Sequence, residues 1–277
     1  MIYRFYKYQG AGNDFLIADN RDGAISVTPE QIASICDRRY GVGADGMMLL
    51  ESSDAYDFRM VYYNSDGSGG MMCGNGGRCI VAFASDMGIG HFDFEAADGF
   101  HTAQIIKSEG QVKIVRLKMR DVSEICRHSV LQGVLVPSEG YFLDTGTRHY
   151  VRFVNDLDNY DIVSEGRDIR YNAVELQPIG ANVNFVEPCD KGIKVRTYEK
   201  GVEDETYACG TGIVASCIAA YKEGVSPTSC EDGRVCYDVM AKRDRLAVDF
   251  MPGDVAEDVF LTGPATFVAE ILIDCLI

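Results

Sequence analysis

Apolar residues along the chain form short alternating runs and helical stripes. The opening run IYRFYKY alternates and predicts a strand, and GAGNDFLIAD predicts a glycine turn followed by a second strand. Thr28, Pro29 and Gln31 then supply an N-cap, a first-turn proline and the glutamine of a capping box. We therefore expect a helix here that carries Ile32, Ile35 and Arg39 and ends near Gly41.

The loop GVGADG, from Gly41 to Gly46, matches the glycine spacing of dinucleotide-binding loops. Such a loop follows a strand and opens a helix, whereas here a predicted helix precedes it and the strand-like run MMLLE follows. We interpret GVGADG as a turn.

One arrangement of elements occurs twice. In the first copy the strand DFRMVYY ends at Asn64, a glycine-rich turn leads to Cys73, and a helix with an apolar stripe can end at Gly88. In the second copy the strand IKVRTY ends at Glu199, the turn KGVEDETYA leads to Cys209, and a second apolar helix can end at Gly224.

The spacing indicates a duplicated domain. Cys209 follows Cys73 by 136 positions (209 − 73), and Gly146 of TGTRHYV follows Gly12 of GAGNDFL by 134 (146 − 12). A period of this length is typical of duplicated domains and not of solenoid repeats. We expect two similar α/β halves with a boundary near Leu117 to Ile125, each with strands wrapped round one apolar helix.

Composition excludes several classes of protein. The 277 residues carry a formal net charge of −16, so the surface would repel nucleic acid and anionic lipid. The N-terminus lacks the apolar core of a signal peptide, and no run reaches the roughly 20 apolar residues of a spanning helix. We expect a soluble cytoplasmic protein. The ten cysteines include no C-x-x-C pair, which favours free thiols over zinc sites.

Two cysteines, Cys73 and Cys209, stand at a turn-to-helix junction between glycines. The first N–H groups of a helix have no intrahelical partner and carry partial positive charge, so they can stabilise a thiolate or hold a substrate carboxylate. Proton removal from one face of a carbon and delivery to the other face needs two such groups on opposite walls of one cleft. The other cysteines are interpreted as small buried apolar residues: Cys36, Cys79, Cys126, Cys189, Cys217, Cys230, Cys236 and Cys275.

The sequence resembles the diaminopimelate epimerases along its whole length, through GAGNDF, GVGAD, YYNSDGS, MCGNGGRC, NVNF, YEKGVEDETYACGTG and LTGPATFVAEI. The resemblance implies a cofactor-independent isomerase, without pyridoxal phosphate or metal, that interconverts L,L- and meso-diaminopimelate in lysine and cell-wall precursor biosynthesis. It implies two pseudo-two-fold related halves, each a barrel-like sheet round a central helix, with residues 1–118 and 264–277 in one and 119–263 in the other. Diaminopimelate is the expected partner, and a homodimer is plausible.

The resemblance also assigns site residues. Cys73 and Cys209 would be the catalytic acid and base, with His149 and Glu199 supporting them. Substrate-binding positions would be Asn13, Asn64, Gly74, Asn75, Asn182, Glu199, Lys200, Gly210 and Thr211. From the residues alone, a turn role for Asn13, strand-end capping by Asn182 and a structural role for His149 stay open.

The chain departs from the family pattern in four places. Lys200 stands where an arginine is common, and its ammonium cannot form the planar bidentate contact that a guanidinium makes with a carboxylate. Thr147 stands where an asparagine is usual, Gly46 where many members have glutamine, and GVEDET is one residue longer than the common form.

Three alternatives remain at this point. A proline or hydroxyproline racemase also uses two cysteines, but its first motif normally has histidine at the position of Asn75. A thiol redox protein would join Cys73 to Cys209 in a regulatory disulfide. A non-catalytic metabolite-binding module would need neither thiol.

Overall fold

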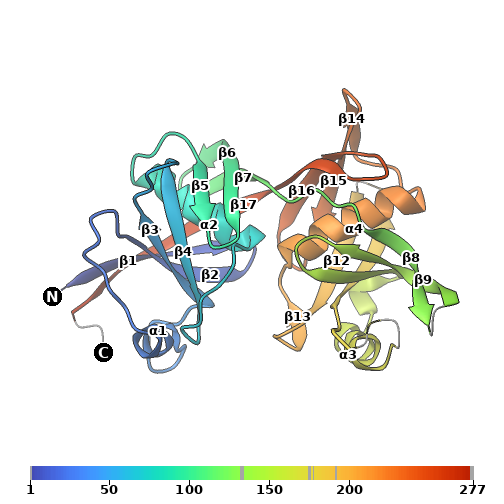
Figure 1. The fold of residues 1–277 in the computed structure, drawn as a ribbon, viewed down its shortest axis with the longest axis horizontal. Helices are drawn as coiled ribbons and strands as arrows, with labels where there is room; N and C mark the ends of the chain where they lie inside the picture. The colour runs from blue at the N-terminus through green and yellow to red at the C-terminus, as the bar shows by residue number, and fades with distance from the viewer. Residues whose placement is uncertain (1, 132–133, 174–175, 177, 191, 275–277) are drawn as a thin grey trace. The chain divides into compact units, whose positions relative to one another are not determined.

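A computed structural model describes residues 2–131, 134–173, 176, 178–190 and 192–274 (Figure 1). The chain divides into two compact units, Met1–Lys118 with Gly263–Ile277, and Met119–Thr262. Each unit is described by itself.

The first unit is a closed barrel. In the part of the chain that the structure describes, eight strands pair in a ring in the order β1, β2, β3, β4, β5, β6, β7, β17 and back to β1. The pairs β2–β3 and β4–β5 are parallel. The strands are β1 (Tyr3–Gly10), β2 (Asn13–Asp19), β3 (Gly46–Glu51), β4 (Phe58–Asn64), β5 (Asp93–Ala96), β6 (Gly99–Glu109), β7 (Val112–Lys118) and the later part of β17 (Glu257–Ile273).

Helix α2 (Gly74–Asp86) packs against strands β1, β2, β3, β6 and β7 of this barrel (Figure 1). Every residue from Gly74 to Ala84 is buried. A helix that is apolar all round has to be enclosed, and the run IVAFA supplies that apolar surface. The expected apolar helix is confirmed and buries Ile80, Phe83 and Ala84; it ends at Asp86, two residues before the predicted Gly88.

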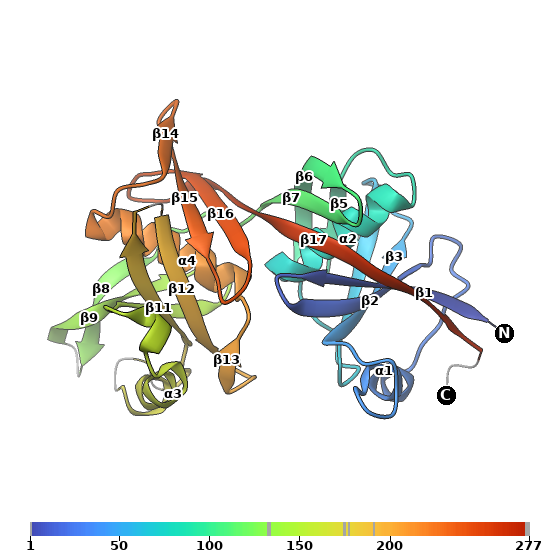
Figure 2. The same cartoon turned by 180° about the vertical axis from the view of Figure 1, so that it is seen from behind.

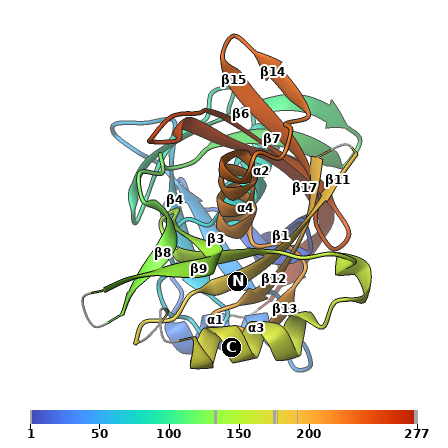
Figure 3. The same ribbon diagram turned by 90° about the vertical axis from the view of Figure 1, so that its right-hand side faces the viewer.

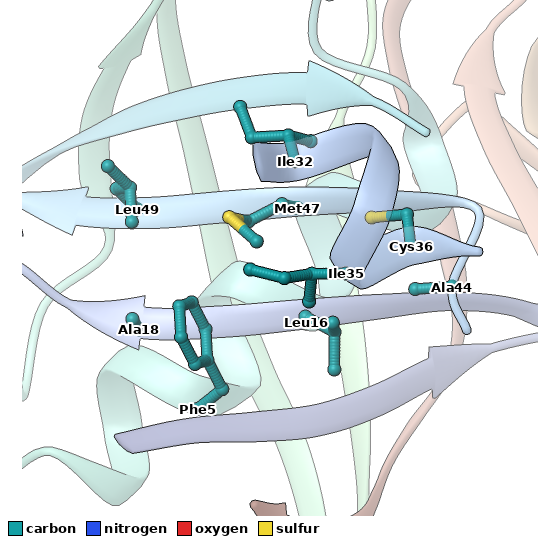
Figure 4. Packing of buried hydrophobic residues seen from close by; sticks show 9 residues of the cluster. All are labelled: Phe5, Leu16, Ala18, Ile32, Ile35, Cys36, Ala44, Met47 and Leu49. Atoms are coloured by element: carbon teal, nitrogen blue, oxygen red, sulfur yellow. The ribbon is translucent and has the colours of Figure 1, made fainter. Parts of the chain in front are cut away.

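Helix α1 (Pro29–Cys36) covers the outside of the barrel. Thr28 caps it, and the predicted capping box with Gln31 is present. The helix buries Ile32, Ile35 and Cys36 in an apolar cluster with side chains of β1, β2 and β3 (Figure 4). The expectation that it would continue to Gly41 is wrong, because the Asp37 carboxylate accepts from the backbone N–H groups of Arg39 and Tyr40 and turns the chain away.

The second unit repeats this plan. Among its described residues the strands pair in the order β8, β9, β10, β11, β12, β15, β16 and β17, with β10–β11 and β12–β15 parallel. Helix α4 (Gly210–Glu223) packs on β9, β10, β11, β12 and β16 (Figure 3). The elements are β8 (Ile125–Leu131), β9 (Val134–Asp144), β10 (Arg148–Phe153), η1 (Leu157–Asn159), α3 (Ile162–Asn172), β11 (Asn182–Cys189), β12 (Gly192–Glu199), β13 (Asp204–Thr206), β14 (Ser229–Glu231), β15 (Arg234–Met240) and β16 (Arg245–Met251).

The succession of pairings confirms the internal repeat and the predicted mixed α/β fold. In each unit an antiparallel hairpin is followed by a helical crossover to a parallel strand, an antiparallel partner, and a second crossover through the buried helix. One detail differs from expectation, because the predicted turn KGVEDETYA contains the short strand β13. The last strand, β17, begins at Glu257. From Thr266 onward β17 pairs with β1 (Figure 2).

The cysteines of the described residues are free thiols, as predicted. Cys36, Cys79 and Cys217 are buried, which confirms their packing role. For Cys189 and Cys230 that interpretation is wrong, because Cys189 is exposed at the end of β11 and Cys230 is exposed in the middle of β14. Cys126 and Cys236 are only partly buried, and Cys275 lies outside the described residues. No helix in the described ranges has the length and apolar character needed to cross a membrane.

Candidate active site

Cys73 is the N-cap residue of α2. Its backbone is extended, and its Sγ accepts a hydrogen bond of 3.2 Å from the backbone N–H of Gly76. Gly74 and Asn75 form the first turn of the helix, and both are buried. Because the helix N-terminus and the Gly76 N–H both direct positive charge at the sulfur, this position stabilises negative charge on it.

The start of α2 is held by a buried arginine. The guanidinium of Arg78, fully buried, donates to the carbonyl of Gly74 (2.9 Å), to Oδ1 of Asn75 (2.9 Å) and to the carbonyl of Pro264 in β17 (3.4 Å). Arg78 therefore fixes the side chain of Asn75 and ties the turn that carries Cys73 to the barrel wall.

Cys209 occupies the equivalent N-cap of α4 and is 7% exposed. Its side chain makes no capping bond to the helix; instead Sγ lies 3.5 Å from the Thr211 hydroxyl. Gly210 and Gly212 form the first turn with Thr211. The two thiols thus share a place in the fold but differ in the group that contacts the sulfur.

His149 lies directly behind the second thiol. The side chain is 1% exposed, and its Nε2 is 3.0 Å from the Thr211 hydroxyl and 2.9 Å from the Thr147 hydroxyl. On the other side of the ring, the amide nitrogen of Asn184 is 3.1 Å from Nδ1. Burial lowers the pKa of His149 to about 3, so the imidazole is neutral at pH 7.

Glu199, Lys200 and Asn182 meet at the ends of β12 and β11. The Glu199 carboxylate accepts from the Thr206 hydroxyl at 2.8 Å. Asn182 accepts from the backbone N–H of Lys200 (2.8 Å) and donates to the carbonyl of Arg148 (3.4 Å), which is the strand-end capping left open above. The Lys200 ammonium donates to the Ile179 carbonyl at 2.8 Å, so in this structure it points back to its own unit.

The longer GVEDET segment is anchored through one carboxylate. Glu203, with a backbone φ of 60°, accepts from the guanidinium of Arg170 and from the hydroxyls of Tyr171 and Tyr198. The Arg170 guanidinium, as the leading cause, lowers the pKa of Glu203 to about 2. The turn after Lys200 is therefore fixed on α3.

In the first unit, Asn13 and Asn64 lie at the ends of strands, and each has a hydrogen-bond partner within the unit. Asn13 begins β2, and its amide donates to the Asp45 carboxylate at 2.5 Å. Asp45 in turn pairs with Arg38 at 2.7 Å. Asn64 ends β4, and its amide donates to the Ser68 hydroxyl at 3.0 Å. Both asparagines have structural partners, and their proposed substrate role stays a prediction.

Two departures from the family pattern now have a physical setting. The Thr147 hydroxyl contacts both His149 and Thr211, so it belongs to the network behind Cys209. A Cβ on Gly46 would lie 2.6 Å from the Tyr62 ring and 2.6 Å from the carbonyl of Tyr63. In this chain the Tyr62 ring fills the space that a side chain at position 46 would need.

Sequence reasoning missed three residues that hold the site: Arg78, Asn184 and Thr197. Arg78 was visible inside GGRC as a charge within an otherwise apolar helix, which signals a buried, satisfied cation. Asn184 and Thr197 looked like ordinary strand residues. Their alternation with apolar neighbours could not show that the Thr197 hydroxyl donates to Asn184 or that Asn184 lies against Gly212 of α4.

A cavity of about 740 Å³ in the first unit is lined by residues of β4, by Gly69 to Met71 and by Glu95 to Ala97. None of the predicted site residues lines it. Among the residues that the structure describes, no group of three or more histidine, cysteine or acidic side chains is placed to hold a metal ion. The expected independence from cofactors stays a prediction.

Comparison with known proteins identifies the family of the chain. The family model for diaminopimelate epimerase matches residues 5–122 and 141–255. A diaminopimelate epimerase of Flavobacterium psychrophilum is 42% identical over 276 residues, covering 96% of this chain and 98% of the relative. One from Chlorobaculum tepidum is 42% identical over 261 residues, covering 92% and 95%.

Solved structures share the fold at low sequence identity. A phenazine biosynthesis protein of the PhzF family from Bacillus anthracis has a TM-score of 0.70 at 17% identity, covering 99% of this chain and all of that one. A hydroxyproline epimerase from Agrobacterium vitis has a TM-score of 0.69 at 13% identity, covering 98% and 92%. With its two motif cysteines at equivalent helix N-termini and a family match over both units, the chain belongs to the diaminopimelate epimerase family.

Proposed function

We propose that this chain is a cofactor-independent isomerase that interconverts L,L-diaminopimelate and meso-diaminopimelate, in lysine and cell-wall precursor biosynthesis. Identity of 42% over nearly the full length of relatives with that name supports the reaction. The observation that carries the mechanism is the placement of Cys73 and Cys209 as the N-cap residues of the two buried helices. We also propose that it acts in the cytoplasm.

In the proposed reaction one cysteine, as thiolate, takes the proton from the α-carbon, and the other, as thiol, delivers a proton to the opposite face. The C–H bond breaks with its electron pair left on carbon, and a new C–H bond forms from that pair. The substrate ends with one proton lost and one gained, and the two thiols exchange protonation states. The reverse reaction uses the same groups with their roles exchanged.

Helix N-termini support this chemistry in two ways. They stabilise the thiolate form of an N-cap cysteine, and they provide N–H groups that can bind the α-carboxylate next to the reacting carbon. We assign carboxylate binding to Gly74, Asn75, Gly210 and Thr211. Asn13, Asn64, Asn182, Glu199 and Lys200 are assigned to the remaining polar groups of the substrate, and one thiol is contributed by each of the halves 1–118 with 264–277 and 119–263.

The test measures α-hydrogen exchange and inversion on L,L-diaminopimelate in heavy water. The native chain should place deuterium at one α-carbon and yield the meso isomer. Cys73→Ala and Cys209→Ala should each lower kcat for inversion by at least about 1000-fold, because a two-base reaction fails without either base. Cys189→Ala, which removes an exposed thiol, is the matched control and should keep native activity.

Near-native inversion by either single variant would refute the two-cysteine mechanism. Inversion of L-proline but not of diaminopimelate would favour the racemase alternative. A redox role would show activity that follows a Cys73–Cys209 disulfide, with no exchange of the α-hydrogen.

A further inference from the structure

Four side chains behind Cys209 form one hydrogen-bonded row, in which Thr197, Asn184 and His149 are buried and Thr211 is half-buried. It runs from the Thr197 hydroxyl to Oδ1 of Asn184 (2.9 Å), from the Asn184 amide nitrogen to Nδ1 of His149 (3.1 Å), and from Nε2 of His149 to the Thr211 hydroxyl (3.0 Å). The Thr211 hydroxyl then reaches Sγ of Cys209 at 3.5 Å. Thr197 is 3% exposed and Asn184 fully buried, so water cannot replace these partners.

The orientation of the Asn184 amide is determined by its surroundings. Its nitrogen lies 3.1 Å from the backbone carbonyl of Tyr150, and a carbonyl can only accept. The amide oxygen therefore faces the Thr197 hydroxyl, which donates to it. The nitrogen has two hydrogens: one goes to the Tyr150 carbonyl and the other is directed at His149.

This orientation determines where His149 carries its proton. Because the Asn184 amide donates to Nδ1, that nitrogen has to be the acceptor and carries no hydrogen. The single proton of the neutral ring is then on Nε2, which faces the hydroxyls of Thr211 and Thr147. Whichever hydroxyl receives it, the Thr211 hydrogen is left to point at the sulfur, since Thr147 can donate onward to Thr211 at 3.3 Å.

We infer that Asn184 and Thr197 are positioning residues that hold His149 as the neutral Nε2–H tautomer, so that His149 stabilises the Cys209 thiolate through Thr211 as a hydrogen-bond donor. In this arrangement His149 does not accept the substrate proton, because the one ring nitrogen without a hydrogen, Nδ1, already accepts a hydrogen bond from the Asn184 amide. Desolvation acts in the same direction, since burial lowers the pKa of His149 to about 3. The inference deepens the proposed function and rests on it for the catalytic consequence.

The first readout is independent of activity. The chain has four histidines, so nitrogen-15 labelling of histidine gives few ring signals, and the nitrogen shifts of the two tautomers and of the imidazolium are well separated. His149 should show the Nε2–H pattern from pH 8 to pH 5. Asn184→Leu should lose this single pattern. Ser216→Ala removes a buried hydrogen bond within α4, from the Ser216 hydroxyl to the Gly212 carbonyl, and should keep the pattern.

The second readout is kinetic. Asn184→Leu should lower kcat about 10-fold with KM within twofold, because it weakens donation to the sulfur and removes no group assigned to the substrate. Thr211→Val should lower kcat and also raise KM, since Thr211 is assigned to carboxylate binding as well, but it should leave the His149 tautomer unchanged because Thr147 still accepts. Urea unfolding of each variant confirms that the variant is folded.

A native His149 that carries its proton on Nδ1, or that is an imidazolium at pH 7, would overturn the inference. So would an Asn184→Leu protein with the native tautomer and native kcat. If the native chain did not epimerise at all, the proposed function would fail while the tautomer measurement still tested the hydrogen-bond assignment.

Discussion

Gly212 is the third residue of α4 and lies against the Asn184 side chain of the row behind Cys209. A Cβ added there would lie 2.2 Å from Oδ1 of Asn184 and 3.3 Å from Cβ of Cys209. Real Cβ atoms stay at least 3.0 Å from such an atom, so one partner has to move by at least 0.8 Å (3.0 − 2.2). The Asn184 amide cannot yield easily, because Thr197, Tyr150 and His149 all bond to it.

The cost of Gly212→Ala can be worked from these contacts. Overpacking a close-packed site costs about 1–3 kcal/mol. A buried amide that loses a partner adds about 1–3 kcal/mol. Alanine favours the helix over glycine by about 1 kcal/mol. We therefore expect Gly212→Ala to lower the free energy of unfolding by about 1–5 kcal/mol, with a midpoint of about 3 kcal/mol.

Gly76 provides the matched control, because it is the third residue of α2 and stands three positions after Cys73 as Gly212 stands after Cys209. Its added Cβ would be 3.2 Å from Sγ of Cys73 and otherwise at ordinary contact distances. Gly76→Ala should therefore change the unfolding free energy by less than about 1 kcal/mol, since the helix gain offsets the small strain. The assay is urea unfolding followed by circular dichroism. Equal stability of the two alanine variants would refute the close approach of α4 to Asn184.

Two further predictions concern the buried imidazole of His149 and the buried guanidinium of Arg78. His149 has a pKa of about 3 in the folded chain against about 6.5 when exposed, so the unfolded chain binds the extra proton below pH 6.5 and stability falls as the pH falls. Between pH 7 and pH 5 the free energy of unfolding of the native protein should fall by about 2 kcal/mol more than that of His149→Gln, as measured by urea unfolding at each pH. An equal pH dependence of the two proteins would contradict a buried neutral imidazole. Arg78→Met should lower the free energy of unfolding by about 3 kcal/mol, because it leaves the Gly74 carbonyl and Asn75 without their buried donor. Arg38→Met should lower it by less than about 1 kcal/mol, because the Arg38 guanidinium is 55% exposed. Similar thermal unfolding shifts for the two arginine variants would show that Arg78 does not hold the turn.

Local chemistry explains why much of this fold can be predicted from the sequence. Alternating apolar runs mark strands, and the capping box at Thr28 marks the start of α1. A helix that is apolar on every side, such as the one after Cys73, has to be enclosed by other elements. The duplicated order of strand, turn, cysteine and helix likewise depends only on neighbouring residues. Errors arose where a single side chain changed the local path, as Asp37 does at the end of α1.

The side chains that lie near each sulfur are determined by contacts across strands, which the order of residues along the chain does not show. Asn184 and Thr197 face each other because β11 and β12 pair in the register that sets Asn184 opposite Thr197. The parallel pairing of β10 with β11 places His149 opposite Asn182, within reach of the Asn184 amide. The sequence by itself thus determined the two halves, their buried helices and the two thiols at the helix starts, because these follow from local patterning. Only the tertiary structure decided which buried groups surround each sulfur, because hydrogen-bond partners in a sheet are chosen by register and packing and not by proximity along the chain.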